Sequence, residues 1–88
     1  MHTNPSIEKI CAELCQFISI SILADGIVLD KNAELKNIGV DSFSLIEIVL
    51  FIERQYGIVL ADESLVPENL FSVESIANCT FHQLTIAK

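Results

Sequence analysis

Apolar residues recur at three- and four-residue spacings in three stretches of the chain, and this is the spacing of one face of an α-helix. The stretches cover residues 4–23, 42–56 and 72–81, and Ser72 is placed to cap the third. Polar residues occupy the remaining positions, so each helix has one apolar face to bury. The sequence therefore predicts an all-α fold, a small bundle built on three main helices.

Turn-forming residues mark where these helices begin and end. Pro5 is tolerated in the first turn of the first helix, and Asp25-Gly26 ends it. Gly57 closes the second helix as a left-handed cap. About fifteen residues before the second helix have no sustained period and predict a long first loop, of a kind that is uncommon unless it is functional. Residues 62–67 predict one short helix, which the proline at their end limits.

Size and charge narrow the classes of protein further. The 88 residues, 51% of them hydrophobic, suffice for one compact core. We therefore expect a single domain over residues 1–88, with its core in about 5–81. A formal charge of −7 argues against nucleic acid and anionic membrane as partners. The cysteines are odd in number, and neither a signal-peptide pattern nor a membrane-spanning apolar run is present, so we expect a cytoplasmic protein.

One serine stands at the predicted start of the second helix, directly after an aspartate. Asp41 is a good N-cap, because its side chain can accept a backbone N–H of the first turn. Ser42 then lies where amide donors and the positive end of the helix dipole favour an attached phosphate. A catalytic serine would need an adjacent base, but the two histidines, His2 and His82, lie near the chain ends. An Asp-Ser pair on its own is more often a helix cap than a functional site.

The second helix has more apolar surface than a core requires. One face is expected to enter the core, and it consists of Leu45, Ile48, Val49, Ile52 and Tyr56. A second apolar strip lies beside Ser42, bordered by Glu47 and Glu53, and its members are Phe43, Ile46 and Leu50. Such a strip is typical of a surface that meets partner proteins. The alternative is a helix buried more deeply than usual, between the long loop and the short helix.

Residues 39–47, Gly-Val-Asp-Ser-Phe-Ser-Leu-Ile-Glu, resemble the attachment site of acyl and peptidyl carrier proteins. The resemblance covers about residues 32–78. It includes Glu34-Leu35-x-x-Ile38-Gly39 before the site, Glu47 within the helix, Glu53-x-x-Tyr56-Gly57-Ile58 at its end, and Phe71-Ser72-Val73-x-Ser75-Ile76-Ala77 at the start of the last helix.

The resemblance implies a monomeric carrier that is not itself an enzyme. A phosphopantetheinyl transferase would move 4′-phosphopantetheine from coenzyme A onto Ser42, and the arm's thiol would then hold acyl groups as thioesters. Asp41 would cap the helix and assist recognition by the transferase, and Gly39 would let an enzyme approach closely. Acyl-activating and condensing enzymes would be further partners. The residues implied to face partners are Phe43, Ile46, Glu47, Leu50 and Glu53.

Three positions depart from the fatty-acid carriers of this family. Phe43 replaces the usual leucine, Ser44 replaces a residue that is often acidic, and Arg54 interrupts an acidic run. These departures favour a dedicated carrier in a polyketide or modified-lipid pathway over the housekeeping fatty-acid carrier. Aminoacyl, peptidyl and aryl carriers share the same motif and stay open as alternatives.

Other functions have weaker support in the sequence. Cys11 and Cys15 could ligate a metal with Cys79 or His82, but both fall on an apolar face, so we expect no metal site. The stretch from Asp25 lacks the oxygen ligands of a calcium loop. An unmodified helical interaction module that uses the same apolar strip is the remaining alternative, and a small enzyme is disfavoured because no nucleophile and base converge.

Overall fold

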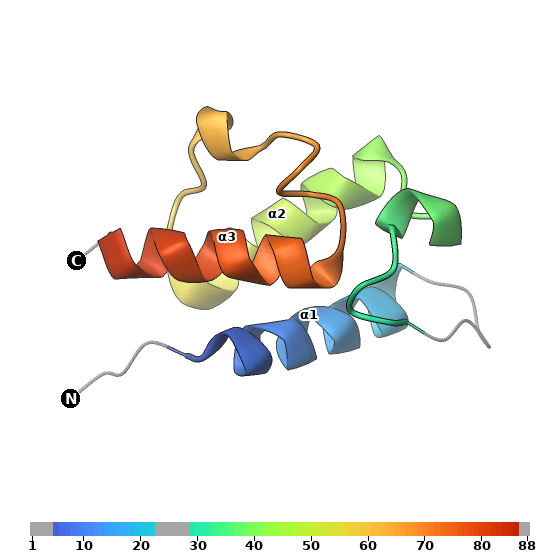
Figure 1. The fold of residues 1–88 in the computed structure, drawn as a ribbon, viewed down its shortest axis with the longest axis horizontal. Coiled ribbons are helices and arrows are strands. Elements are labelled where there is room, and N and C mark those ends of the chain that lie inside the picture. The colour runs from blue at the N-terminus through green and yellow to red at the C-terminus, as the bar shows by residue number, and fades with distance from the viewer. Residues whose placement is uncertain (1–4, 23–28, 87–88) are drawn as a thin grey trace.

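The computed structural model describes residues 5–22 and 29–86 (Figure 1). Its elements are helix α1 (Ile7–Ser21), the 3₁₀ helix η1 (Leu35–Ile38), helix α2 (Ser42–Tyr56), the 3₁₀ helix η2 (Asp62–Ser64) and helix α3 (Val73–Ile86). No strand occurs among the described residues. The predicted all-α bundle of three main helices is therefore confirmed, with η2 as the predicted short helix.

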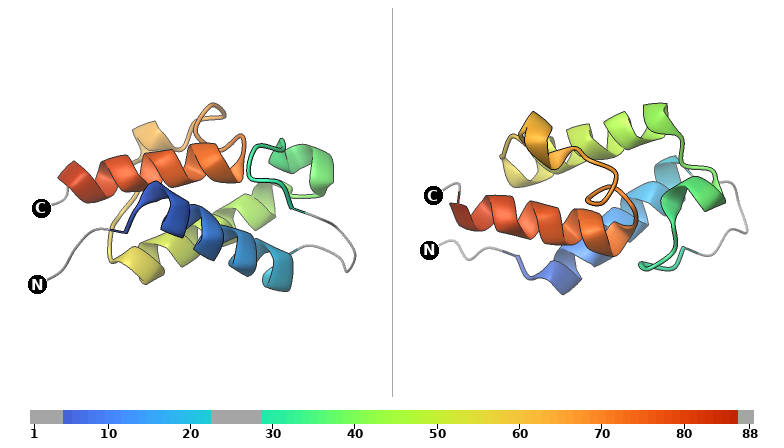
Figure 2. Two further views of the ribbon diagram at one scale, coloured as in Figure 1. Left: turned by 60° about the horizontal axis from the view of Figure 1, so that its bottom comes forward. Right: turned by 45° about the horizontal axis from the view of Figure 1, so that its top comes forward.

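The core lies between the three main helices. Helices α1 and α3 lie side by side and run in opposite directions, while α2 crosses them (Figures 1 and 2). Each helix gives its apolar face to the same cluster, and the loop before α2 adds Leu35 and Val40. The side chains that are fully or almost fully buried in α1, α2 and α3 are Ile10, Leu14, Ile18, Ile48, Ile52, Val73, Ile76, Ala77 and Thr80. One shared core thus fixes the position of α2, which carries the candidate serine.

Helix α1 begins later than the sequence predicts. Its cap is Ser6, whose Oγ accepts the Lys9 N–H at 3.1 Å, and Pro5 precedes the cap. The placement of Pro5 in the first helical turn is therefore wrong, because a serine cap in extended backbone outcompetes it as the starting residue. At the other end, the Ile22 N–H donates to the Ile18 carbonyl at 3.0 Å. The predicted stop at Asp25-Gly26 lies outside the described residues.

Helix α3 begins as predicted but extends further. Ser72 Oγ accepts the Ser75 N–H at 3.2 Å, and Ser75 Oγ accepts the Ser72 N–H at 2.9 Å, a reciprocal cap with serine at both positions. The helix continues past Phe81 to Ile86, so the predicted end is wrong. No glycine or proline follows Phe81, and Leu84 joins the partly buried residues that pack on the core.

The described part of the first loop is anchored to the start of α3. The Leu35 N–H donates to the Phe71 carbonyl at 2.9 Å, and the Glu74 N–H donates to the Lys31 carbonyl at 2.9 Å. The second bond satisfies an N–H at the open end of α3, which has no partner within the helix. The loop also contains η1, which the sequence did not predict. These ties fix the approach to α2.

A tyrosine links α1 to the last turn of α2. The Tyr56 hydroxyl donates a hydrogen bond to the Glu13 carboxylate. Burial raises the pKa of Tyr56 well above its ordinary value, and the hydrogen bond to Glu13 and the charge of Glu13 raise it further. The neutral phenol is therefore the form that the fold stabilises.

Replacing Tyr56 by phenylalanine should lower stability at neutral pH by about 1 kcal/mol, the net contribution of one such hydrogen bond. Because the folded-state pKa is raised, this contribution is complete below the unfolded pKa of about 10 and is lost as pH rises through the folded value. Urea unfolding at a series of pH values should show a steeper alkaline loss for the wild type than for Tyr56→Phe. Burial also raises the thiol pKa of Cys11 and of Cys15, so ionisation of these thiols adds to the alkaline loss of stability in both proteins. Equal alkaline slopes would contradict the expectation.

Candidate functional site

The start of α2 is formed by an aspartate cap. Asp41 has extended backbone, and its Oδ1 accepts the Ser44 N–H at 2.9 Å. Its carbonyl accepts the Leu45 N–H at 2.9 Å, the first bond of the helical ladder. The hydrogen bond from the Ser44 backbone lowers the pKa of the Asp41 carboxyl, and a bond from the Ser44 side chain lowers it further. The predicted N-cap is therefore present and ionised at neutral pH.

Ser42 is the first residue of α2, and it is exposed. Its place in the first turn puts it where the helix leaves backbone N–H groups without partners in the ladder. The positive end of the helix dipole adds to the attraction for an anion. The position thus combines an accessible hydroxyl with an electropositive surrounding.

Gly39 turns the chain toward this helix. It has φ 98° and ψ 10°, a left-handed conformation that L side chains rarely adopt, and it ends η1. A Cβ at this position would meet no atom within 4 Å, so the backbone angle, not lack of space, requires the glycine. The turn directs Val40 into the core and leaves Asp41 at the surface.

An apolar cavity of about 380 Å³ lies beside Ser42, between α2 and the segment around η2. Apart from Ser42, its walls are aliphatic: Leu45, Ile46, Val49, Leu50, Leu65 and Leu70. A second cavity of about 290 Å³ shares Leu45, Leu65 and Leu70 with it. Leu65 and Leu70 were not predicted as part of the site, because the segment after η2 has no helical periodicity. Their only signal in the sequence is that they are apolar residues on either side of Pro67.

The outer face of α2 is apolar near Ser42. Phe43 is 71% exposed, Ile46 58% and Leu50 47%, whereas Ile48 and Ile52 on the inner face are fully buried. The alternative of deep burial is therefore wrong for these three residues. We call Phe43, Ile46 and Leu50 the outer strip.

The two glutamates assigned to the border of this strip differ in their surroundings. Glu47 is exposed. Glu53 is half-buried, and its Oε2 accepts the Leu60 N–H at 3.1 Å, which holds the chain after Gly57 against α2. The structure therefore brings Gly39, Asp41 and Ser42 together with the outer strip and Glu47. Glu53 lies further along the helix and has a structural contact.

A family model described as a phosphopantetheine attachment site matches residues 8–79. The chain belongs to the phosphopantetheine-attachment family. No protein in a search of curated sequences matches it significantly. Domains of this family are the attachment site for covalent 4′-phosphopantetheine and are not catalytic themselves. They are modified by phosphopantetheinyl transferases and interact with biosynthetic enzymes.

The start of α2 fits a covalently attached phosphopantetheine arm. Ser42 offers an exposed hydroxyl, the first turn of α2 offers an electropositive environment for a phosphodiester, and the neighbouring cavity offers an apolar surface. Asp41 is the one unfavourable neighbour, because its carboxylate has the same charge as the phosphodiester. The exposure of Asp41 to solvent screens that repulsion.

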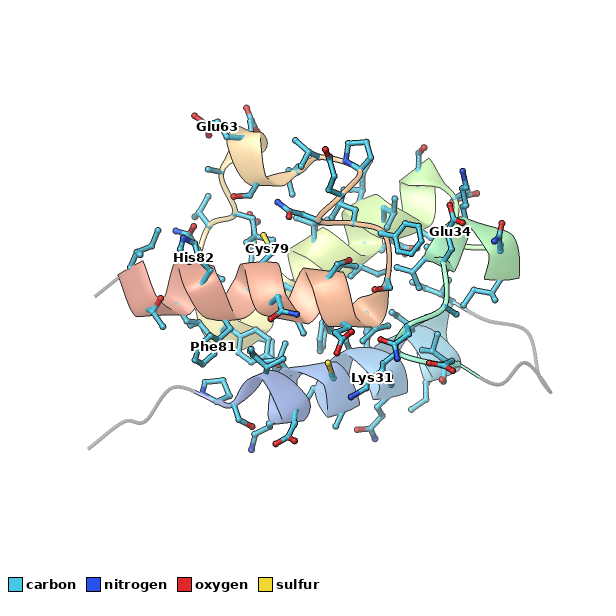
Figure 3. The ribbon with its side chains drawn as sticks, in the orientation of Figure 1. Lys31, Glu34, Glu63, Cys79, Phe81 and His82 are labelled. Carbon is cyan, nitrogen blue, oxygen red and sulfur yellow. The ribbon has the colours of Figure 1, made fainter. Side chains whose placement is uncertain are left out.

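The other cysteines and the histidine among the described residues do not form a metal centre. Figure 3 shows Cys79 and His82 projecting from the side of α3 that faces away from α1, the helix that holds Cys11 and Cys15, whereas Phe81 points toward α1. Among the described residues, no group of three or more His, Cys, Asp or Glu side chains is placed to hold a metal ion. Within the same residues, no helix is long and apolar enough to cross a membrane.

Proposed function

We propose that Ser42 is the residue that carries the arm and that the protein is an acyl carrier. The observation that supports this most is the position of Ser42, an exposed hydroxyl at the start of α2 inside the region matched by the family model. Asp41 fixes that start by capping it. Gly39 leaves open space on the approach, since nothing lies within 4 Å of where its Cβ would be.

The attachment chemistry uses only the hydroxyl of this chain. The Ser42 oxygen forms a bond to the pantetheine-side phosphorus of coenzyme A, the phosphoanhydride bond breaks, and adenosine 3′,5′-bisphosphate leaves. The serine proton passes to a base of the transferase. When bound, the arm supplies a thiol that can hold an acyl group as a thioester. This chain contributes position, solvent access and an electropositive setting for the phosphodiester.

The cavity beside Ser42 favours an acyl cargo over an aminoacyl one. Its walls consist of leucine, isoleucine and valine, with no side chain that could pair with an ammonium group. An unpaired charge is costly to bury, whereas an aliphatic chain gains about 25 cal/mol for each Å² removed from water. With the departures at Phe43, Ser44 and Arg54, this supports a specialised polyketide or modified-lipid pathway. Aminoacyl, peptidyl and aryl cargo is the alternative.

The outer strip, with Glu47, is the surface we assign to the transferase and to acyl-activating and condensing enzymes. Its three exposed apolar side chains lie within three turns of Ser42, and an acidic residue stands among them. Interfaces combine an apolar centre with a polar rim in this way. Glu53 would stand at the far rim of this surface, where its Oε2 accepts the Leu60 N–H.

Mass spectrometry of the intact protein tests the proposal. Coexpression with a broad-specificity phosphopantetheinyl transferase should add one arm, about 340 Da from its composition. Fragmentation of the modified peptide should place the arm on Ser42. An unchanged mass in the presence of an active transferase would instead favour an unmodified interaction module that uses the outer strip.

Attachment of the arm should raise the pKa of Asp41. In the unmodified protein this pKa is lowered by hydrogen bonds from Ser44 to the charged carboxylate. A phosphodiester anion on the adjacent residue disfavours the same charged form, so the pKa moves upward. Carboxyl ¹³C shifts recorded against pH, before and after modification, measure the change. A Ser42→Ala protein treated with the transferase serves as the control, and an identical titration of Asp41 in both forms of the wild type would contradict the expectation.

A further inference from the structure

Helices α1 and α2 cross (Figure 2), and side chains from both of them line a hollow. Its floor is formed by the rings of Phe17 and Phe51, which stack with centroids 4.3 Å apart and planes inclined by 14°. Both phenylalanines are only half-buried, and Ile20 on the same side of α1 is 74% exposed. The crossing of α1 and α2 therefore leaves an aromatic surface open to solvent.

Two adjoining depressions, of about 250 and 300 Å³, make up the hollow. Phe17, Phe51 and Gln55 line both of them. Arg54 lines the smaller depression, where it is the only charged side chain, whereas the larger one is also lined by Ile20, Glu13, Gln16 and Ser21. We call this set, Phe17, Ile20, Phe51, Arg54 and Gln55, the aromatic hollow. On α2, Phe51 of this set lies nearly opposite Val49, because two residues rotate an α-helix by 200°.

Arg54 is the feature of the hollow that points to a ligand. It is the only basic residue of α2, in a chain with a formal charge of −7. Its side chain is exposed, and it forms no ion pair or hydrogen bond with any of the residues that the structure describes. A guanidinium offers a planar fork of donors that matches a carboxylate. An acidic ligand is opposed by the negative charge elsewhere on the chain and by Glu13 in the larger depression, so its carboxylate fits only the smaller depression, beside Arg54.

We propose that the aromatic hollow is a docking site for a partner protein that presents a carboxylate next to an apolar or aromatic side chain. The carboxylate pairs with Arg54, and the neighbouring side chain covers Phe17 and Phe51. Aromatic residues and arginine are the types enriched at protein interfaces. The site lies away from Ser42 on α2, so this inference goes beyond the proposed function and does not depend on where the arm is attached.

The position of Arg54 has a purely structural explanation that the test must separate. A cation in the last turn of a helix interacts favourably with the helix dipole, with an effect of about 0.3–1 kcal/mol at an exposed site. A structural role alone predicts that Arg54→Glu lowers stability slightly without changing any binding. A docking role predicts that binding depends on the sign of the charge at this position.

Nuclear magnetic resonance titration of the ¹⁵N-labelled protein tests the docking site. The probe is a short capped peptide of alternating glutamate and phenylalanine, and two matched peptides replace every glutamate by lysine or every phenylalanine by alanine. The glutamate–phenylalanine peptide should shift amide signals of residues 16–21 and 51–55. Arg54→Glu should weaken this binding by about tenfold and strengthen binding of the lysine peptide. Lys9→Glu, at an exposed cation elsewhere on α1, is the matched control and should change the affinity little.

Several results would overturn the proposal. These are the absence of a saturable shift, shifts that map to other residues, equal affinity of the alanine peptide, and an Arg54→Glu effect no larger than that of Lys9→Glu. Amide shifts at the hollow that depend on the protein's own concentration, before peptide is added, would show that a second copy occupies it. Ser42→Ala should bind the peptide as the wild type does. A failure of arm attachment and a failure of this docking site are therefore distinguishable.

Discussion

Replacing Ser42 by alanine should abolish phosphopantetheinylation completely. The variant, coexpressed with the transferase, should keep its unmodified mass while the wild type gains one arm. The physical reason is that only the Ser42 hydroxyl is both exposed and located at the first residue of α2, where a phosphodiester is stabilised by the helix terminus. The fold should survive, because alanine is a good helix former and the cap resides on Asp41.

Ser44→Ala is the matched control for this experiment. Ser44 lies in the same helical turn, but it is half-buried, and its N–H is bonded to Asp41. The Ser44→Ala protein should gain one arm, as the wild type does. The altered helix start can lower the rate of this gain but not its final extent. A mass gain in Ser42→Ala would place the arm on another residue, and loss of the gain in Ser44→Ala alone would place it on Ser44. Circular dichroism of both variants should match the wild type, which separates loss of the hydroxyl from loss of the helix.

The sequence predicted the parts of this fold that depend on local rules. The Asp41 cap, the Gly57 left-handed end and the Ser72 cap each follow from one residue's backbone preference and appear in the structure. The inner face of α2 also follows, because a period of 3.6 places Ile48 and Ile52 together, and both are fully buried.

The features that sequence reasoning missed depend on tertiary contacts or on competing caps. Ser6 displaces Pro5 from the first turn, which a count of apolar positions does not reveal. The 3₁₀ helix η1 is held by hydrogen bonds between the first loop and the start of α3, residues far apart in the sequence. The bond from the Leu60 N–H to Glu53 was also not foreseen, because it forms only after Gly57 reverses the chain. The cavity beside Ser42 could not be predicted either, because it forms only where the fold brings Leu65 and Leu70 against α2.

Replacing Ile48 by alanine should lower the free energy of unfolding by about 2–5 kcal/mol, the range for large-to-small changes in a packed core. Ile48 is fully buried in the core cluster that the three helices share, so the lost methyl and methylene groups leave a cavity. A small domain has only about 5–15 kcal/mol of stability in total, so this single change removes a large share of it. Urea unfolding followed by circular dichroism measures the loss as a lower transition midpoint.

Ile46→Ala removes the same atoms two residues away, on the opposite side of α2, where the side chain is 58% exposed. Its effect on the free energy of unfolding should stay within about 0.5 kcal/mol, as for most surface substitutions. Equal losses in the two variants would contradict the assignment of faces to α2, because they would place both isoleucines in the core. If the faces are as described, Ile46→Ala remains folded and should be modified more slowly by the transferase. Ile48→Ala should instead recover a normal modification rate under conditions that restore its fold, since its side chain is not part of the outer strip.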